Sequence, residues 1–337
     1  MVQEKKLVDE VSGWLRVYDD GSVDRTWTGP PEFRFMAEPV PPHEHFIDGV
    51  ATRDVTIDPS SNLRVRIYLP EEHRNPTPGT KFPVVLHFHG GGFCISQPDW
   101  LMYYDVYTRL AKSVPAIVVS VYLRLAPENK LPAACDDGYA ALLWLKSLAK
   151  GESNEPWLNE HGDFTRVFLI GDSSGGNIVH QVAARGGSID LTPLSLSGAI
   201  PIHPGFARAQ RSKSELEQPE SPFLTLDMAD KFLALALPDG CTKDHPVSCP
   251  MGSGAPPIET LNLPPMLFCV AEKDLMLDTE MEYYECLRKA NKDVELLISP
   301  QMGHSFYLNK IAVDKDPVTG ARTSELIDGI KEFINKK

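Results

Sequence analysis

Short apolar runs recur along the chain, and stretches whose apolar residues follow helical spacing separate them. The runs are four to seven residues long, a length that favours buried strands over helices. Strands that alternate with helices are typical of a mostly parallel sheet flanked by helices, so the pattern predicts an α/β fold. The predicted strands are Val84–Phe88, Ala116–Val121, Val167–Ile170, Leu196–Ile202, Met266–Val270 and Glu295–Ile298.

The region before these strands has a different pattern. Residues 52–58 and 63–69 alternate apolar and polar side chains with a period of two, which predicts an antiparallel hairpin. Lys5–Trp14 has the spacing of an amphipathic helix. Trp27–Phe46 is rich in proline and aromatic residues, too irregular for a sheet and too apolar for a disordered tail, so we expect it to lie over the mouth of a site. Pro76–Gly79 predicts a surface loop.

One long segment, Pro204–Leu263, interrupts the alternation of strands and helices. It is charged in its first part, rich in proline and glycine in its later part, and helical in pattern at Leu226–Leu237. We interpret it as an insertion that forms a cap together with the N-terminal segment. The predicted division is an N-terminal cap segment (1–46), the first part of the core (47–203), the cap insertion (204–263) and the second part of the core (264–337).

Length and charge exclude some classes of function. The 337 residues carry 33 Lys and Arg against 46 Asp and Glu, a formal net charge of -13. Binding to a phosphate backbone needs a basic face, so nucleic acid is not an expected partner. No apolar run approaches the ~20 residues of a membrane helix, and no signal-peptide pattern opens the chain. We therefore expect a cytoplasmic protein that does not insert into membranes.

The six cysteines show no paired spacing. Cys94, Cys135 and Cys269 lie in apolar surroundings and are expected to be reduced core residues. Cys241 and Cys249 flank a loop of the cap insertion, where a disulfide is geometrically conceivable. A reducing compartment argues against that bond.

A serine motif follows the predicted strand that ends at Ile170. Residues Gly171–Asn177 contain a Gly-x-Ser-x-Gly pattern centred on Ser173, and a helical pattern follows at Ile178–Ala184. Ser173 is therefore predicted on a sharp strand-to-helix turn, the nucleophile elbow, where Gly171 and Gly175 allow the close approach of neighbouring backbone. A carboxylate at a helix start commonly caps amides, so we interpret Asp172 as a residue of local order.

A serine nucleophile needs a base, and the base needs an acid that orients it. Asp274 lies on the loop after the strand at 266–270, and His304 on the loop after the strand at 295–298. The order Ser173, Asp274, His304 is the order that this kind of sheet uses. Asp278, one helical turn later, is the alternative acid, and we favour Asp274 because it is nearer the strand end.

A second glycine motif, His89–Gly92, ends the strand at 84–88. The backbone amides of Gly90 and Gly91, with the Ser174 amide after the nucleophile, are candidate donors to a developing oxyanion, and Gly92 is a further candidate.

His89 is interpreted as a residue that orients this glycine loop by hydrogen bonding. His87 shares the side of the strand with His89, which would suit a metal pair, but no third ligand is spaced for zinc. We therefore expect neither a metal nor an organic cofactor. The remaining histidines are expected to be structural or surface residues, with His180 in the core.

The two motifs accompany further stretches in a familiar order, and with them the chain resembles the plant-type carboxylesterases of the hormone-sensitive-lipase branch of the α/β-hydrolases, relatives of the gibberellin receptors. The resemblance implies an α/β-hydrolase fold with a helical cap and a triad at Ser173, Asp274 and His304. Related receptors have an apolar residue at the position of His304, and related legume dehydratases have Thr at that of Ser173; this chain has neither change. The further stretches are Leu15–Val23, Leu125–Glu128, Leu131–Ala134, Asp136–Asp137 and Asp244–Pro246.

These features predict a carboxylic-ester hydrolase that forms an acyl-enzyme with small or medium esters, either plant metabolites or xenobiotics. One alternative is a lyase or cyclase that acts on a plant secondary metabolite in the same pocket, with His304 as the base. The other is a hormone-binding receptor, against which the intact triad argues. The expected partner is a small-molecule ester, and the sequence does not determine the oligomeric state.

Overall fold

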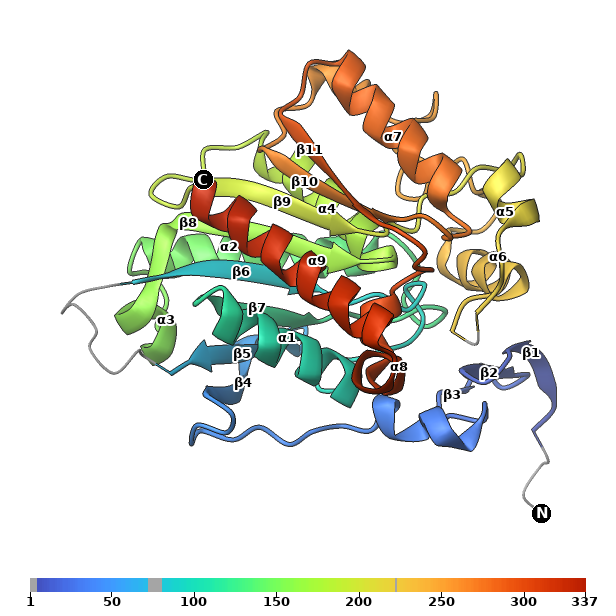
Figure 1. Cartoon of the computed structure of the whole chain (residues 1–337), viewed down its shortest axis with the longest axis horizontal. Coiled ribbons are helices and arrows are strands. Elements are labelled where there is room, and N and C mark those ends of the chain that lie inside the picture. Colours follow the sequence, from blue (N-terminus) through green and yellow to red (C-terminus); the bar gives the residue numbers. More distant parts are fainter. Residues whose placement is uncertain (1–4, 72–80, 222) are drawn as a thin grey trace.

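The computed structural model describes residues 5–71, 81–221 and 223–337. Its centre is an eight-stranded sheet in the order β11-β10-β9-β8-β6-β7-β5-β4 (Figure 1). None of the helices in the described ranges has the length and apolar character needed to cross a membrane. The strands are β4 (Val50–Asp58), β5 (Leu63–Pro70), β6 (Phe82–Phe88), β7 (Ile117–Tyr122), β8 (Gly162–Asp172), β9 (Leu196–Ile202), β10 (Met266–Ala271) and β11 (Val294–Ser299).

The sheet is mostly parallel, as predicted. Strands β7, β6, β8, β9, β10 and β11 run parallel to one another, whereas β4 and β5 form the predicted antiparallel hairpin at one edge. Every strand that the sequence predicted is present. Along β8, Val167 and Leu169 pack into one hydrophobic layer, and Phe168 and Ile170 into the other. This alternation is the expected result of a period of two in a sheet that is covered on both faces.

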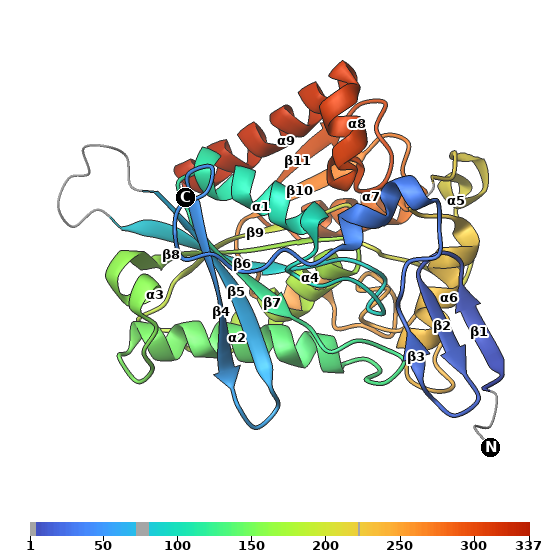
Figure 2. The ribbon, with the colours of Figure 1, turned by 90° about the horizontal axis from the view of Figure 1, so that it is seen from below.

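Helices cover the two faces in separate layers. Figure 2 shows α1 and α9 on one side of the sheet, with α2 and α4 on the other. The arrangement confirms the predicted α/β fold class. The helices are α1 (Leu101–Ser113), α2 (Ala133–Ala149), α3 (Pro156–His161), α4 (Ser174–Gly186), α5 (Lys213–Glu217), α6 (Leu226–Ala236), α7 (Leu277–Lys289), α8 (Lys310–Lys315) and α9 (Pro317–Lys336), with short 3₁₀ helices η1 (Pro31–Ala37), η2 (Ile258–Thr260) and η3 (Phe306–Leu308).

The N-terminal segment differs from the prediction. Lys5–Trp14 is not an amphipathic helix, because Leu7–Val11 forms strand β1 of a small antiparallel sheet with β2 (Leu15–Tyr18) and β3 (Val23–Asp24). Gly13 has a φ of +81°, a left-handed conformation that reverses the chain between β1 and β2. Lys5–Trp14 has only ten residues, too few for the spacing of its apolar side chains to distinguish a helix from a strand.

The predicted cap insertion contains the short helices α5 and α6, and α6 corresponds to the predicted helical segment. The small N-terminal sheet lies beside α6, as both ribbon views show, and β1 contacts this helix. Pro76–Gly79 lies outside the described residues.

All six cysteines are unpaired. Cys94, Cys135 and Cys269 are buried, which confirms the prediction for these three residues. Cys241 is exposed and Cys249 is buried, without the conceivable disulfide between them.

Candidate active site

Ser173 lies in a strained turn between β8 and α4. Its φ of 51° and ψ of -125° are unusual for a residue with a side chain. A Cβ atom on Gly175 would lie 2.0 Å from the carbonyl oxygen of Phe88, and one on Gly171 would lie 2.5 Å from that of Gly175. Only glycine fits at these two positions. The local geometry is therefore that of the predicted strand-to-helix turn.

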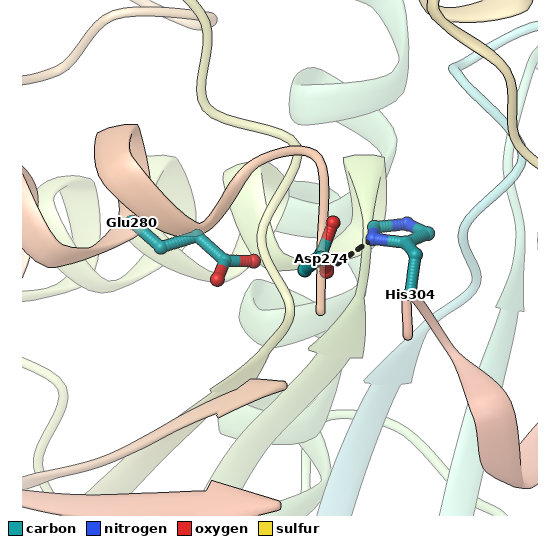
Figure 3. A group of neighbouring side chains, drawn as sticks. All are labelled: Asp274, Glu280 and His304. Carbon is teal, nitrogen blue, oxygen red and sulfur yellow. Dashed lines mark hydrogen bonds and ion pairs between the residues drawn. The ribbon is translucent and has the colours of Figure 1, made fainter. Parts of the chain in front are cut away.

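Asp274 and His304 meet at the same edge of the sheet, on the loops after β10 and β11. His304 Nδ1 lies 2.7 Å from Asp274 Oδ2, and the Met276 amide donates to Asp274 Oδ1 at 2.9 Å (Figure 3). The Asp278 carboxylate instead accepts the Ser214 amide at 2.8 Å. The acid that contacts His304 is thus Asp274, whereas Asp278 fastens α5 to α7.

The electrostatics of this pair favour charge on both members. Burial disfavours the Asp274 charge, but the nearby imidazole outweighs burial and lowers the pKa of the carboxyl below its ordinary value. Burial likewise acts against a charged His304, and the Asp274 carboxylate outweighs it and raises the imidazole pKa. An imidazolium formed during a reaction would therefore be stabilised here.

Ser173 and His304 line the same open cavity. In the described part of the chain, His304 Nε2 is buried and has no hydrogen-bond partner, so no hydrogen bond joins it to Ser173 in this structure. Such bonds commonly tighten only when substrate is bound. The free Nε2 is the ring nitrogen on the far side of the imidazole from Asp274, as a base toward Ser173 requires.

The glycine loop after β6 differs in one respect from the predicted donor set. The Gly90 amide donates to Tyr103 Oη at 3.0 Å, and that hydroxyl donates to Asp172 Oδ2 at 3.1 Å. Gly90 is therefore already engaged beneath the site and does not line the cavity. Tyr103, on α1, is a functional neighbour that sequence reasoning missed, because nothing in a helical pattern marks which tyrosine reaches the loop.

The amides of Gly91, Gly92 and Ser174 have no acceptor within the described ranges, and all three residues line the cavity. The Phe93 amide donates to Ser174 Oγ at 3.1 Å, which ties the glycine loop to the turn at the serine. Gly91, Gly92 and Ser174 are thus the residues whose amides are available at the cavity.

His89 and Asp172 support the loop from below. His89 Nδ1 contacts the carbonyl oxygen of Gly90 at 2.8 Å. Asp172 bonds Tyr103 rather than helix amides, so its role differs from the predicted cap. His87 bonds Ser120 Oγ at 2.6 Å, and so the two strand histidines have separate partners.

A second histidine, His203, supports the loop of His304. It is fully buried, and its Nδ1 accepts the Ser305 amide at 2.9 Å. Burial lowers the pKa of His203 to about 4, so the ring is neutral and able to accept. Nothing in the sequence indicates this role beyond the position of His203 directly after β9.

One group of side chains in the described residues has the composition of a cation site. Asp274, Glu280 and His304 place their nearest ligand atoms within 4.8 Å of one another. His304 Nδ1 and Asp274 Oδ2 are already joined by a hydrogen bond of 2.7 Å. The group therefore fits a hydrogen-bonded acid and base better than a set of metal ligands.

The wall of the cavity is largely apolar and comes from several distant segments. Trp14 lies on the turn between β1 and β2, Met102 on α1, and Phe223 and Phe232 in the segment between β9 and β10. No residue of the described Trp27–Phe46 segment lines the cavity, although Phe33 packs against Phe223 with ring centroids 5.0 Å apart. The N-terminal contact with the cavity is thus Trp14, which precedes the segment predicted to cover the mouth.

Comparison with known proteins agrees with this geometry. Residues 85–308 match the family model described as the alpha/beta hydrolase fold. The chain belongs to the α/β-hydrolase family. The probable carboxylesterase 6 of Arabidopsis thaliana is 36% identical over 332 residues, which cover 98% of this chain and 92% of that protein.

Other members of the family have different names. A gibberellin receptor of Arabidopsis thaliana is 37% identical over 81% of this chain and 80% of its own length. The tuliposide A-converting enzyme 1 of Tulipa gesneriana is 33% identical over 97% of this chain and 79% of that protein. A solved esterase from Pyrobaculum calidifontis aligns with a TM-score of 0.67 at 26% identity and covers 85% of this chain and 84% of its own. The comparisons confirm the predicted family and its kinship with plant carboxylesterases and gibberellin receptors.

Proposed function

We propose that the protein is a carboxylesterase that works through an acyl-enzyme on Ser173. The observation that carries the proposal is that a strained serine lines one cavity together with His304, and that His304 is paired with the buried Asp274. A serine hydroxyl is a weak nucleophile, so an oriented base beside it is the arrangement that acyl transfer requires.

The proposed mechanism begins when His304 Nε2 takes the proton of Ser173 as its Oγ attacks the ester carbonyl. Asp274 holds Nδ1 protonated and stabilises the imidazolium. The amides of Gly91, Gly92 and Ser174 donate to the oxyanion of the tetrahedral intermediate. The imidazolium then protonates the leaving alcohol, and water repeats the sequence on the acyl-enzyme. None of these steps needs a metal or an organic cofactor.

We infer that the substrates are small or medium esters with bulky apolar parts, either plant metabolites or xenobiotics. The apolar wall built by Trp14, Phe223 and Phe232 supports this inference. The division into a core, an N-terminal cap segment (1–46) and a cap insertion (204–263) belongs to the same proposal, with the core carrying the chemistry and the cap the selection.

A cytoplasmic location is also part of the proposal. Six unpaired cysteines suit a reducing compartment. Since some relatives carry the word chloroplastic in their names, a fluorescent fusion of the full chain should be imaged for diffuse cytoplasmic signal against plastid signal.

Two alternatives follow from the sequence, a hormone-binding receptor and a lyase or cyclase, and the relatives include a gibberellin receptor and a tuliposide A-converting enzyme. A small organophosphate and an aryl ester of a short acid separate them. A hydrolase is labelled covalently and releases the aryl alcohol with a burst followed by turnover. A receptor binds without labelling, and a lyase or cyclase is labelled yet leaves the free acid unformed.

A further inference from the structure

Glu280 is a buried carboxyl that the proposed mechanism does not use. It lies on α7 with 0% of its surface exposed, and neither of its carboxylate oxygens has a hydrogen-bond partner in the described chain. Figure 3 shows its side chain directed at Asp274 from the side opposite His304. The three side chains therefore form a row, with Asp274 in the middle.

The carboxyl groups of Asp274 and Glu280 have oxygen atoms within 4.8 Å of each other. Two carboxylates this close in a buried environment cannot both carry a charge. Asp274 has the better claim to the charge, because it accepts hydrogen bonds from His304 and from the Met276 amide. Glu280 has neither. Burial, together with the Asp274 charge, raises the pKa of Glu280 well above its ordinary value and so favours its protonated form.

A protonated carboxyl is a hydrogen-bond donor, and each oxygen of Asp274 has a second lone pair. We propose that Glu280 is a positioning residue that stays neutral and donates its carboxyl hydrogen to Asp274, which keeps Asp274 ionised and oriented toward His304. The inference rests on the proposed function, because such a role requires that Asp274 and His304 take part in the reaction.

The direction in which Glu280 shifts the pKa of His304 follows from the orientation of the Glu280 O–H dipole. A donor hydrogen directed at Asp274 offsets part of the negative charge that stabilises the imidazolium, so removing the donor raises the pKa of His304. Other groups act on this row as well: the Cys269 thiol faces Glu280, and Asp172 and His203 face His304. These groups stay constant in the comparison of variants at Glu280.

The test compares Glu280→Gln, which keeps a neutral donor of the same shape, with Glu280→Met, which fills the space without a donor. Glu285→Gln is the matched control, since Glu285 is an exposed residue of the same helix. For each protein, kcat and KM for an aryl ester are measured across pH, and thermal unfolding is followed in parallel.

We expect the Gln variant to keep kcat within about threefold and to leave the acid limb of the pH profile in place. The Met variant should lose about tenfold or more in kcat at little changed KM, with its acid limb moved to higher pH. Wild-type kcat and an unmoved acid limb in the Met variant would reduce Glu280 to a space-filling residue. An acid limb that moves to lower pH in the Gln variant would show that Glu280 is charged, and either result overturns the proposal.

If the Met variant does not fold, an infrared measurement still tests whether Glu280 is protonated. The difference spectrum between wild type and Glu280→Gln at neutral pH should contain the carbonyl band of a protonated carboxylic acid. Its absence would overturn the neutral state that the inference requires. This spectrum does not depend on catalysis, whereas the proposed function itself fails if Ser173→Ala still turns over esters.

Discussion

The edge of the sheet where the parallel strands have their carboxyl ends, called the edge below, and the wall of the cavity are built in different ways. Ser173, Asp274 and His304 follow the carboxyl ends of the parallel strands β8, β10 and β11, so short stretches of sequence and the strand order place them together. The wall joins segments far apart in the chain through aromatic contacts. The ring centroids of Trp14 and Phe223, for example, are 6.3 Å apart. We therefore expect changes at the edge to affect chemistry for every ester, and changes in the wall to affect some esters more than others.

The largest expected effect tests the edge at Ser173. Ser173→Ala removes the nucleophile and should lower kcat/KM for an aryl ester by about a thousandfold or more, whatever the size of the acyl group. Labelling by a small organophosphate should vanish as well. Turnover that survives in a folded variant would end the assignment of Ser173.

The next largest effect distinguishes Asp274 from Asp278 as the acid that orients His304. Asp274→Asn removes the acceptor of the His304 Nδ1 proton and should lower kcat by about a hundredfold or more, because the imidazole is left in the wrong tautomer. Asp278→Asn weakens only the contact with the Ser214 amide and should leave kcat nearly unchanged. The opposite ranking of the two variants would transfer the orienting role to Asp278.

The dependence of the rate on pH tests the base. Only neutral His304 can accept the proton of Ser173, so kcat/KM should fall as the pH drops through the pKa of His304. Because Asp274 raises that pKa, the midpoint should lie above the ordinary imidazole value of about 6.5. A rate that stays level down to pH 5 would mean that His304 is not the base.

A smaller effect is expected at Tyr103, which joins the glycine loop to Asp172. Tyr103→Phe leaves the Gly90 amide and the Asp172 carboxylate without their shared partner, and should lower kcat by about tenfold with little change in KM. Tyr104→Phe is the matched control, since the Tyr104 hydroxyl contacts His43 away from the glycine loop. Equal losses in the two variants would contradict an anchoring role for Tyr103.

The difference between edge and wall also explains what the sequence could predict. The strands β6, β8, β10 and β11 are apolar runs whose period and length can be read locally, and each leads into a motif of its own. By contrast, the partner of Gly90 is a tyrosine on α1, and the carboxyl behind Asp274 belongs to α7. Both contacts depend on how α1 and α7 pack against the sheet, which local sequence does not determine. The helix predicted at Lys5–Trp14 is wrong for a related reason, because ten residues carry little spacing information and the chain reverses at Gly13.

The smallest effect on chemistry is expected from the wall itself. Trp14 is 6% exposed, packs against Trp27, Trp100 and Phe223, and lines the cavity. Trp14→Ala should keep kcat/KM for a short acyl ester within about twofold, because Ser173, His304 and the free amides all follow strands of the central sheet. The preference for a bulky apolar ester over the short one should fall by about fivefold, since the ester loses part of its contact surface.

The control is Trp157→Ala, which removes a tryptophan of α3 that stacks on Arg53 outside the cavity. Organophosphate labelling of Ser173 should proceed at the wild-type rate in both variants, provided that thermal unfolding shows each to be folded. Equal loss of activity toward short and bulky esters in Trp14→Ala would mean that the N-terminal sheet helps to arrange Ser173 and His304. The wall would then share in the chemistry, and the contrast between the two regions would fail.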